Sequence, residues 1–170
     1  MPELATFVAG PDFERQTILL AEDNDDDVLI MRSAFERAVI ANPLQVVNDG
    51  EQVIEYLAGQ GKYADRSQYP LPIILLLDLK MPKQSGLEAL EWLRRQPAFK
   101  CLTVHILTAS SRAADVQRAG ELGANAYLIK PSRFNDLVEM LKAWHTLAKF
   151  QALPQIRLVN ESPFALKPKT

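Results

Sequence analysis

The sequence contains little that would place it outside a reducing compartment. Its single cysteine, Cys101, excludes an internal disulfide. The segment MPELATFVAGPDFERQ at the start has no basic stretch followed by a long apolar run, so no signal peptide is indicated. The most apolar segment, LPIILLLDL, is too short to span a membrane. We therefore expect a cytoplasmic protein that does not bind membranes.

The sequence also lacks a large excess of either charge. Its formal net charge is -2, which provides no basic field for direct binding of nucleic acid. It contains no internal repeat and no sign of a second domain. With 170 residues and a hydrophobic content of 48%, the chain is long enough to bury one sizeable core. A single folded domain is therefore predicted.

What the sequence does contain is a regular alternation of two patterns. Short apolar runs typical of β-strands occur at residues 17–22, 44–48, 73–78, 103–108 and 126–129. Helical periodicity follows these runs, at residues 28–39, 51–58, 87–95, 114–122 and 134–150. Strands that alternate with helices form a parallel sheet that is covered on both faces. The sequence therefore predicts an α/β fold with a doubly wound, five-stranded parallel sheet.

Three segments lie outside this alternation. Residues 1–15 are predicted to form a loose N-terminal arm, ahead of a folded domain at residues 16–150. Within that domain, the stretch GQGKYADRSQYPLP is a long polar connection before the third strand. Residues 151–170 form a C-terminal extension with three prolines and no clear period.

Polar residues follow the carboxyl ends of the predicted strands. In an open parallel sheet these ends meet at one edge, where ligands bind. Clustered carboxylates are oxygen ligands that suit Mg²⁺, and a lysine beside them suits a phosphoryl group. The pattern therefore predicts a phosphoryl site with bound Mg²⁺, and the residues that would face it are Glu22, Asp23, Asn48, Asp49, Asp78, Thr108 and Lys130.

Four motifs on these elements carry a family resemblance. The segments ILLAEDNDDD, LLLDLKMPKQSG, ILTASS and YLIKPS, in this order, resemble the receiver domain of bacterial two-component response regulators. The resemblance covers roughly residues 16–150. It implies a flavodoxin-like fold with strand order 2-1-3-4-5, and a signalling protein that accepts a phosphoryl group from a sensor histidine kinase rather than an enzyme acting on a separate substrate.

The resemblance also implies a role for each matching residue. Asp78 is the expected phosphoacceptor, and Thr108 and Lys130 are expected to contact the phosphoryl oxygens. Thr108 and Tyr127 are the expected switch pair. The expected metal ligands are Asp23 and Asp78 directly, Glu22 through water, and the backbone carbonyl of Lys80. Lys80 stands where many receivers have asparagine, so its ammonium is an additional cation near the site. The Lys130–Pro131 bond is a candidate cis peptide.

Several polar residues have a structural interpretation instead. Asp25, Asp26 and Asp27 lead into a helical pattern, where acids complement the N-terminal dipole. His105 and His145 have no partner ligands in their patterns. We expect these five residues to have structural roles.

One other enzyme class shares part of the pattern. A haloacid-dehalogenase-type phosphatase also uses an aspartate at a strand end, a threonine and a lysine. Its first motif requires Thr or Val four residues after the nucleophile, whereas Asp27 stands four residues after Asp23. Asp78 would then have no function. The phosphatase remains the alternative prediction, and turnover of phosphate esters would distinguish it.

The surroundings of the receiver-like segment predict its partners. The polar insert before the third strand and the extension after the fifth helix resemble the stand-alone regulators that are partnered with phytochrome-type histidine kinases. No output domain follows Phe150, so we expect the output to be a surface.

The fifth helix predicts a further contact. Its sheet-facing stripe consists of Phe134, Leu137, Val138, Leu141, Trp144 and Ala148. Met140, Ala143 and Leu147 extend this stripe toward the side that should meet water. We expect a symmetric homodimer through this helix and the C-terminal extension. The alternative is that the extension folds back over its own helix.

Overall fold

The computed structural model describes residues 12–150 and 158–159 of the 170-residue chain. Most of the predicted arm and extension lies outside these residues. The strands are β1 (Ile18–Ala21), β2 (Leu44–Val47), β3 (Ile74–Leu77), β4 (Thr103–Thr108), β5 (Ala126–Ile129) and β6 (Leu158–Val159). The α-helices are α1 (Asp25–Arg37), α2 (Gly50–Ala58), α3 (Gly86–Arg95), α4 (Ala113–Glu121) and α5 (Phe134–Lys149). Three short 3-10 helices complete the described part, at Phe13–Arg15, Gly61–Tyr63 and Pro97–Phe99.

The strands form one parallel sheet in the order β2-β1-β3-β4-β5-β6. The predicted five strands, their direction and their order 2-1-3-4-5 are confirmed. The sixth strand was not predicted: Leu158 and Val159 pair with Tyr127 and Leu128 of the same chain. The extension therefore returns to the edge of its own sheet at these two residues.

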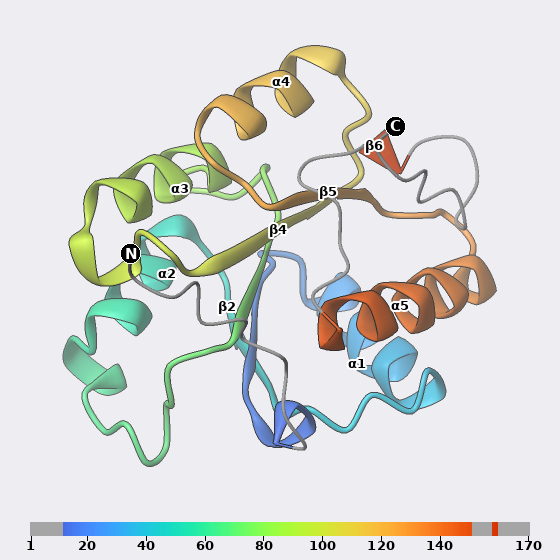
Figure 1. The fold of residues 1–170 in the computed structure, drawn as a ribbon, viewed down its shortest axis with the longest axis horizontal. Coiled ribbons are helices and arrows are strands. Elements are labelled where there is room, and N and C mark those ends of the chain that lie inside the picture. The colour runs from blue at the N-terminus through green and yellow to red at the C-terminus, as the bar shows by residue number, and fades with distance from the viewer. Residues whose placement is uncertain (1–11, 151–157, 160–170) are drawn as a thin grey trace, which may run out of the picture.

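Helices cover both faces of the sheet (Figure 1). Helices α2, α3 and α4 lie on one face, and α1 and α5 lie together on the other. The two faces of β3 contribute to separate hydrophobic clusters, with Leu75 and Leu77 in one and Ile74 and Leu76 in the other. A strand buried on both faces needs a continuous apolar run rather than an alternating one, which explains the sequence of β3.

Side chains at the helix starts fix where the helices begin. Asn24 accepts a hydrogen bond of 3.0 Å from the backbone N–H of Asp27 and caps α1. The first turn of α1 contains Asp25, Asp26 and Asp27, which confirms their structural role beside the positive end of the helix dipole. The helix thus begins three residues before the predicted Val28, because the apolar period shows only the buried part of it. Ser85 and Glu88 form a reciprocal capping box at α3.

The polar connection before β3 is a packed structure around Arg66. Its guanidinium donates hydrogen bonds of 2.7 Å to the carbonyls of Tyr56 and Leu57 at the end of α2. A further bond of 3.2 Å reaches the carbonyl of Tyr69. The rings of Tyr56, Tyr63 and Tyr69 pack against one another, with centroids 5.1 to 6.0 Å apart. This segment therefore closes the end of α2 and one side of the core.

The end of the predicted N-terminal arm is packed rather than loose. The ring of Phe13 is 2% exposed and contributes to the cluster beneath α1 and α5. Asn42 donates hydrogen bonds to the carbonyls of Phe13, at 2.7 Å, and Gln16, at 3.0 Å. The turn at residues 13–15 is therefore part of the folded domain.

Helix α5 differs from its predicted amphipathic pattern at two positions. Met140 is 3% exposed and packs in the core of its own chain, so the expectation that it faces water was wrong. Phe134, which was placed in the buried stripe, is 41% exposed because it is the first residue of the helix. Ala143 and Leu147 are half-buried, and Phe150 after the helix is exposed.

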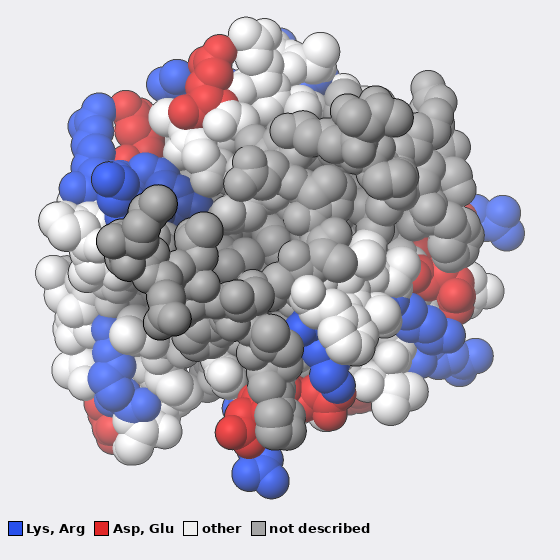
Figure 2. All heavy atoms as spheres, viewed as in Figure 1, with Lys and Arg blue, Asp and Glu red and all other residues white. Residues whose placement is uncertain are grey.

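No helix within residues 12–150 has both the length and the apolar surface needed to cross a membrane. On the face shown in Figure 2, basic and acidic side chains stand beside one another around the described surface. Neither sign of charge dominates that face.

Candidate functional site

The strand register brings the predicted site residues to one edge of the sheet. Ala21 of β1 lies beside Leu77 of β3, and Leu77 lies beside Ile106 of β4. Thr108 at the end of β4 lies beside Ile129 of β5. Since the strands are parallel and in register, the residues that follow them emerge together. These residues are Glu22, Asp78 and Lys130, with Thr108 ending its own strand.

Three carboxylates gather at this edge. Glu22, Asp23 and Asp78 each place one carboxylate oxygen within 4.8 Å of the other two. Glu22 is 1% exposed and Asp78 is 8% exposed, whereas Asp23 lies at the surface. Opposite ligands of an octahedral Mg²⁺ ion are about 4 Å apart, and carboxylate oxygens are its preferred donors. The residues present therefore fit the predicted metal.

Lys130 supplies a positive charge to the two buried acids. Its ammonium contacts the carboxylate of Glu22 and donates a hydrogen bond of 3.1 Å to Asp78. The described residues contain no cis peptide bond, so the Lys130–Pro131 bond, a candidate for the cis form, is trans in this structure. The side chain reaches the crevice with a trans bond because Lys130 directly follows β5, where its N–H is held by the carbonyl of Thr108.

The protonation of Glu22 depends on this environment. Burial raises the pKa of Glu22 to about 7, and the contact with Lys130 only partly opposes this effect. Burial lowers the pKa of Lys130, but the charges of Asp78 and Glu22 outweigh it and raise that pKa overall. A divalent cation among these oxygens would favour the ionised form of Glu22.

Asp78 is held in place by the loop that follows it. Its Oδ1 accepts a hydrogen bond of 3.2 Å from the backbone N–H of Lys80. A Cβ on Gly86 would lie 2.1 Å from the carbonyl oxygen of Asp78, so only glycine permits α3 to begin this close to Asp78. The side chain of Lys80 is exposed and forms no ion pair with any described residue. It does not reach the acids in this structure.

The predicted switch residues lie behind Asp78 and are joined by Ser110. Thr108 is 1% exposed, and its hydroxyl accepts a bond of 3.3 Å from the N–H of Ser110. The ring of Tyr127 is fully buried, and its hydroxyl donates a bond of 2.9 Å to the carbonyl of Ser110. Ser110 in turn donates a bond of 2.5 Å to Asp115 in α4.

Ser110 was not among the predicted site residues. The sequence contained a signal for it in the segment ILTASS, but a backbone carbonyl that binds a tyrosine leaves no mark on the side-chain pattern. Burial raises the pKa of Tyr127, so its hydroxyl remains a donor at neutral pH.

The other polar residues at the strand ends do not join the carboxylate cluster. Asn48 donates a hydrogen bond of 3.2 Å to the carbonyl of Glu22. Asp49 caps α2 by accepting a bond of 2.8 Å from the N–H of Gln52. Both residues support the site from β2 rather than forming part of it.

The two histidines have structural partners, as expected. His105 is buried and accepts a hydrogen bond from Trp144. His145 pairs with the side-chain oxygen of Asn42 at 2.7 Å.

The chain is similar to known signalling proteins. A solved structure of response regulator RPA3017, described as acting in red light signalling of R. palustris, shares 39% identity with a TM-score of 0.75; the match covers 78% of this chain and 92% of that one. Response regulator Rcp1 of Synechocystis sp. is 33% identical over 75% of this chain and 84% of its own length. Its Mn²⁺-bound structure has a TM-score of 0.70, with 30% identity over 82% of this chain and 98% of that chain.

A third relative has a different described role. The probable methanogenesis regulatory protein FilR2 of Methanothrix harundinacea is 35% identical over 75% of this chain and 81% of its own length. The family model of the response regulator receiver domain matches residues 18–142, which include every predicted site residue. The chain therefore belongs to the response regulator receiver domain family.

Proposed function

We propose that this response regulator accepts a phosphoryl group on Asp78 from a sensor histidine kinase, in the cytoplasm and with Mg²⁺. The observation that carries this proposal is the position of Lys130 between Glu22 and Asp78, within a cluster of three carboxylates that Asp23 completes at the surface. A lysine and several acids around one ionised aspartate form a site for a phosphoryl group and its metal.

The transfer step places a phosphoryl group on a carboxylate. An oxygen of Asp78 forms the new bond to phosphorus, and the bond from phosphorus to the phosphohistidine nitrogen breaks. The electron pair of that bond stays on the nitrogen. The product on this chain is an acyl phosphate, whose oxygens carry more charge than the carboxylate that they replace.

The chain's own residues prepare this step. Lys130 supplies a cation for the transferred oxygens, and the Thr108 hydroxyl provides a donor at the end of β4. Asp23, Asp78, Glu22 and the carbonyl of Lys80 are the groups that would hold the metal. When bound, Mg²⁺ offsets the negative charge of the carboxylates and of the phosphoryl oxygens.

The same residues provide a signal. We propose that Thr108 moves toward the phosphoryl oxygens and that Ser110 transmits this movement to Tyr127 and α4. Supporting this, Ser110 bonds to all three at 3.3, 2.9 and 2.5 Å. The ring of Tyr127 is already buried in this structure, so the signal would change the bond that its hydroxyl makes rather than the position of the ring. The surface around β4 and β5 would change as a result.

The similarity to RPA3017, described as acting in red light signalling, supports a phytochrome-type kinase as the partner. The structure of the cyanobacterial phytochrome response regulator RcpA supports it as well, with 28% identity and a TM-score of 0.71 over 78% of this chain and 93% of that chain. The chain would then act as a phosphoacceptor that catalyses only its own phosphorylation and dephosphorylation. The phosphatase alternative is not supported, because the whole arrangement of strand ends matches the receiver family.

Intact mass before and after incubation with Mg²⁺ and acetyl phosphate tests the phosphoacceptor. The parent protein should gain one base-labile phosphoryl group, and Asp78→Asn should gain none. Asp23→Ala should lose both the Mg²⁺ requirement and most of the reaction. Equal modification of Asp78→Asn would refute the assignment, and catalytic turnover of a phosphate ester would restore the phosphatase.

We further propose that the protein forms a symmetric homodimer through α5 and the C-terminal extension. The apolar surface at the C-terminal end of α5 includes half-buried Ala143 and Leu147 and exposed Phe150. A two-fold contact would bury this surface twice. Leu153, Ile156 and Phe164 of the extension lie outside the described residues.

Light scattering at micromolar concentration tests the dimer. The full chain should have the mass of a dimer, and Leu147→Glu should be a folded monomer that still accepts phosphate. Thr146→Glu, at an exposed neighbouring position, is the control and should remain dimeric. A monomeric parent would exclude the proposal.

A further inference from the structure

The loop between β3 and α3, residues 79–85, contains the expected metal ligand at Lys80 and is fixed at both ends. Leu79 and Met81 are buried in the core. At the other end, Ser85 caps α3 and the N–H of Gly86 donates a bond of 3.1 Å to the carbonyl of Leu79. In the middle of the loop, the N–H of Gln84 donates a bond of 2.7 Å to the carbonyl of Pro82, and the other contacts of Pro82 to Gln84 come from another element.

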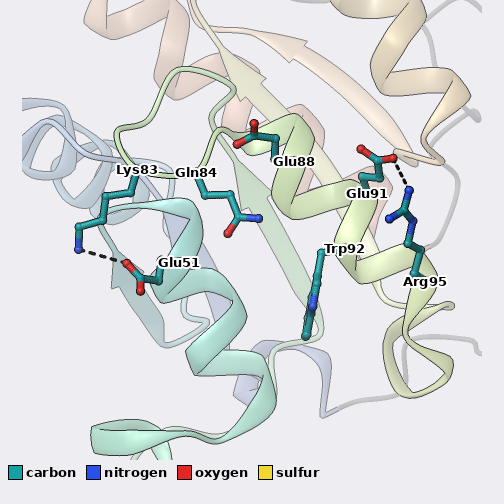
Figure 3. Close-up of a pocket in the computed structure, with 7 residues that line it drawn as sticks. All are labelled: Glu51, Lys83, Gln84, Glu88, Glu91, Trp92 and Arg95. Atoms are coloured by element: carbon teal, nitrogen blue, oxygen red, sulfur yellow. Dashed lines mark hydrogen bonds and ion pairs between the residues drawn. The ribbon is translucent and has the colours of Figure 1, made fainter.

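That element is the junction between β2 and α2. The N–H of Gly50 donates a hydrogen bond of 3.0 Å to the carbonyl of Gln84. A Cβ on Gly50 would lie 2.2 Å from the same oxygen, so the backbone of α2 touches the backbone of the loop directly. The ammonium of Lys83 lies 3.3 Å from Asp49 and 3.4 Å from Glu51. Figure 3 shows Lys83 reaching from the loop to Glu51 at the start of α2.

The backbone of Lys83 has a conformation that is unfavourable for a lysine. Its φ is 61°, in the left-handed region where a glycine would be free of strain. A lysine at such a position is costly unless its side chain compensates. Here the side chain pairs with Asp49, whose own side chain is only 6% exposed. Little water screens that partner, so this ion pair is stronger than one between two exposed groups.

The same junction also supports the first acidic loop. The side chain of Asn48 bonds to the carbonyl of Glu22, and the N–H of Glu22 donates a bond of 2.9 Å to the carbonyl of Val47. Residues 47–51 therefore contact both loops that carry expected metal ligands.

We propose that the Asp49–Lys83 ion pair is a positioning device that presets the β3–α3 loop for Mg²⁺ binding. Asp49 and Lys83 would raise the metal affinity without touching the metal, by holding the carbonyl of Lys80 and the carboxylate of Asp78 in place. This inference rests on the proposed metal site at Asp78. Partners outside the ligand shell act in this way in other metal sites.

The direction in which loss of the Lys83 charge changes the Mg²⁺ affinity separates this proposal from simple electrostatics. Acting through space alone, the loss of the Lys83 charge would strengthen the binding of a cation, whereas loss of the Asp49 charge would weaken it. A positioning device predicts that both losses weaken binding. Lys83→Gln is therefore the decisive variant.

Isothermal titration of the full-length, unphosphorylated protein with Mg²⁺ alone measures the affinity. Lys83→Gln and Asp49→Asn should each weaken binding roughly tenfold. The asparagine keeps the cap of α2, because its side-chain oxygen still accepts from Gln52. The double variant should be no weaker than either single variant, since both remove the same contact. Lys83→Arg should restore most of the affinity.

Hydrogen exchange of the metal-free protein provides a second readout. The amides of residues 80–84 should exchange faster in Lys83→Gln and Asp49→Asn than in the parent. Lys142→Gln breaks an exposed lysine–glutamate pair on α5 and should change neither readout. Thermal unfolding in EDTA verifies that each variant is folded.

If the parent binds Mg²⁺ and accepts phosphate but Lys83→Gln binds Mg²⁺ as tightly or more tightly, the positioning device is wrong and the metal site stands. A parent that binds no Mg²⁺ overturns the metal site on which it rests.

Discussion

Trp144 donates a hydrogen bond of 3.0 Å from its indole Nε1 to Nδ1 of His105, joining α5 to the central strand β4. Both side chains are buried. The acceptor nitrogen must carry no proton, so the bond exists only with a neutral imidazole. Burial lowers the pKa of His105 to about 4, well below its ordinary value of 6.5.

Stability should therefore fall with acidification through His105. The lowered pKa means that the unfolded chain binds a proton below pH 6.5 while the folded protein resists protonation down to about pH 4. The resulting loss in the free energy of unfolding is absent at pH 7, grows as the pH falls from 6.5 to about 4 and reaches about 3 kcal/mol. In urea unfolding, His105→Gln should flatten this dependence, because an amide oxygen still accepts from Trp144 and does not titrate. The difference between the pH dependences of the two proteins separates the contribution of His105 from that of the other titrating groups. If the free energy of unfolding has the same pH dependence in both proteins, this account is wrong.

Gly86→Ala should impair the site and the fold together. The added Cβ would lie 2.1 Å from the carbonyl oxygen of Asp78, so either α3 or Asp78 must move. We expect a loss of about 2 kcal/mol in the free energy of unfolding and slower phosphorylation by acetyl phosphate. Gly61→Ala is the control: its Cβ meets nothing within 4 Å and its φ of 57° adds strain alone. It should cost about 1 kcal/mol without slowing phosphorylation. Similar phosphorylation rates in both variants would show that the close contact is unimportant.

Arg66→Met should destabilise the protein by about 2 kcal/mol in urea unfolding, because the carbonyls at the end of α2 lose a charged donor. Lys62→Met provides a comparison in the same segment. Lys62 is exposed, with its ammonium 5.0 Å from the centroid of the Tyr63 ring, and should cost less than about 1 kcal/mol. Equal losses in the free energy of unfolding would mean that Arg66 contributes only its positive charge and not its hydrogen bonds to these carbonyls.

Thr108→Val should separate phosphorylation from its structural response. The variant keeps Asp78, Lys130 and the acidic cluster and should accept a phosphoryl group. It lacks the hydroxyl that accepts from Ser110, so the chemical shifts of Tyr127 and Ser110 should change less on phosphorylation than in the parent. Thr108→Ser retains the hydroxyl and should respond as the parent does. Parent-like shifts in the valine variant would exclude this coupling.

Mg²⁺ should raise the unfolding temperature of the protein, because an ion that binds only the folded state stabilises it by mass action. At a concentration one hundred times the dissociation constant, the gain is about 2.7 kcal/mol. Asp23→Ala removes one carboxylate of the cluster and should abolish the gain. Differential scanning calorimetry with Mg²⁺ and with EDTA measures the gain in the parent and in Asp23→Ala. A gain that survives in Asp23→Ala would place the ion elsewhere.

The sequence pattern was sufficient to predict the first five strands and the cluster at their carboxyl ends, and the family resemblance supplied the strand order. Buried parallel strands such as β3 require continuous apolar runs, which stand out from the polar segments around them. Glu22, Asp78 and Lys130 directly follow such runs, so their shared edge follows from the sheet alone.

The features that were not predicted depend on tertiary contacts. Met140 is buried because α1 and the sheet enclose more of α5 than one apolar stripe indicates. Phe13 is buried because Asn42 binds the backbone around it across 29 residues of sequence. Ser110 acts partly through its carbonyl, which every residue possesses, and β6 consists of two residues, which is too short for any period.

The turn at Phe13 also has a consequence for the synthesis of the protein. Asn42 holds this turn, and the side-chain oxygen of Asn42 pairs with His145 near the end of α5. Lys149 of the same helix pairs with Glu14 at 2.8 Å. The first described segment is thus closed by the last helix, and Ile18 and Leu20 of β1 share a cluster with that helix. A nascent chain that still has α5 inside the ribosome therefore leaves part of its first strand uncovered, and the domain completes its core only when translation of that helix has finished.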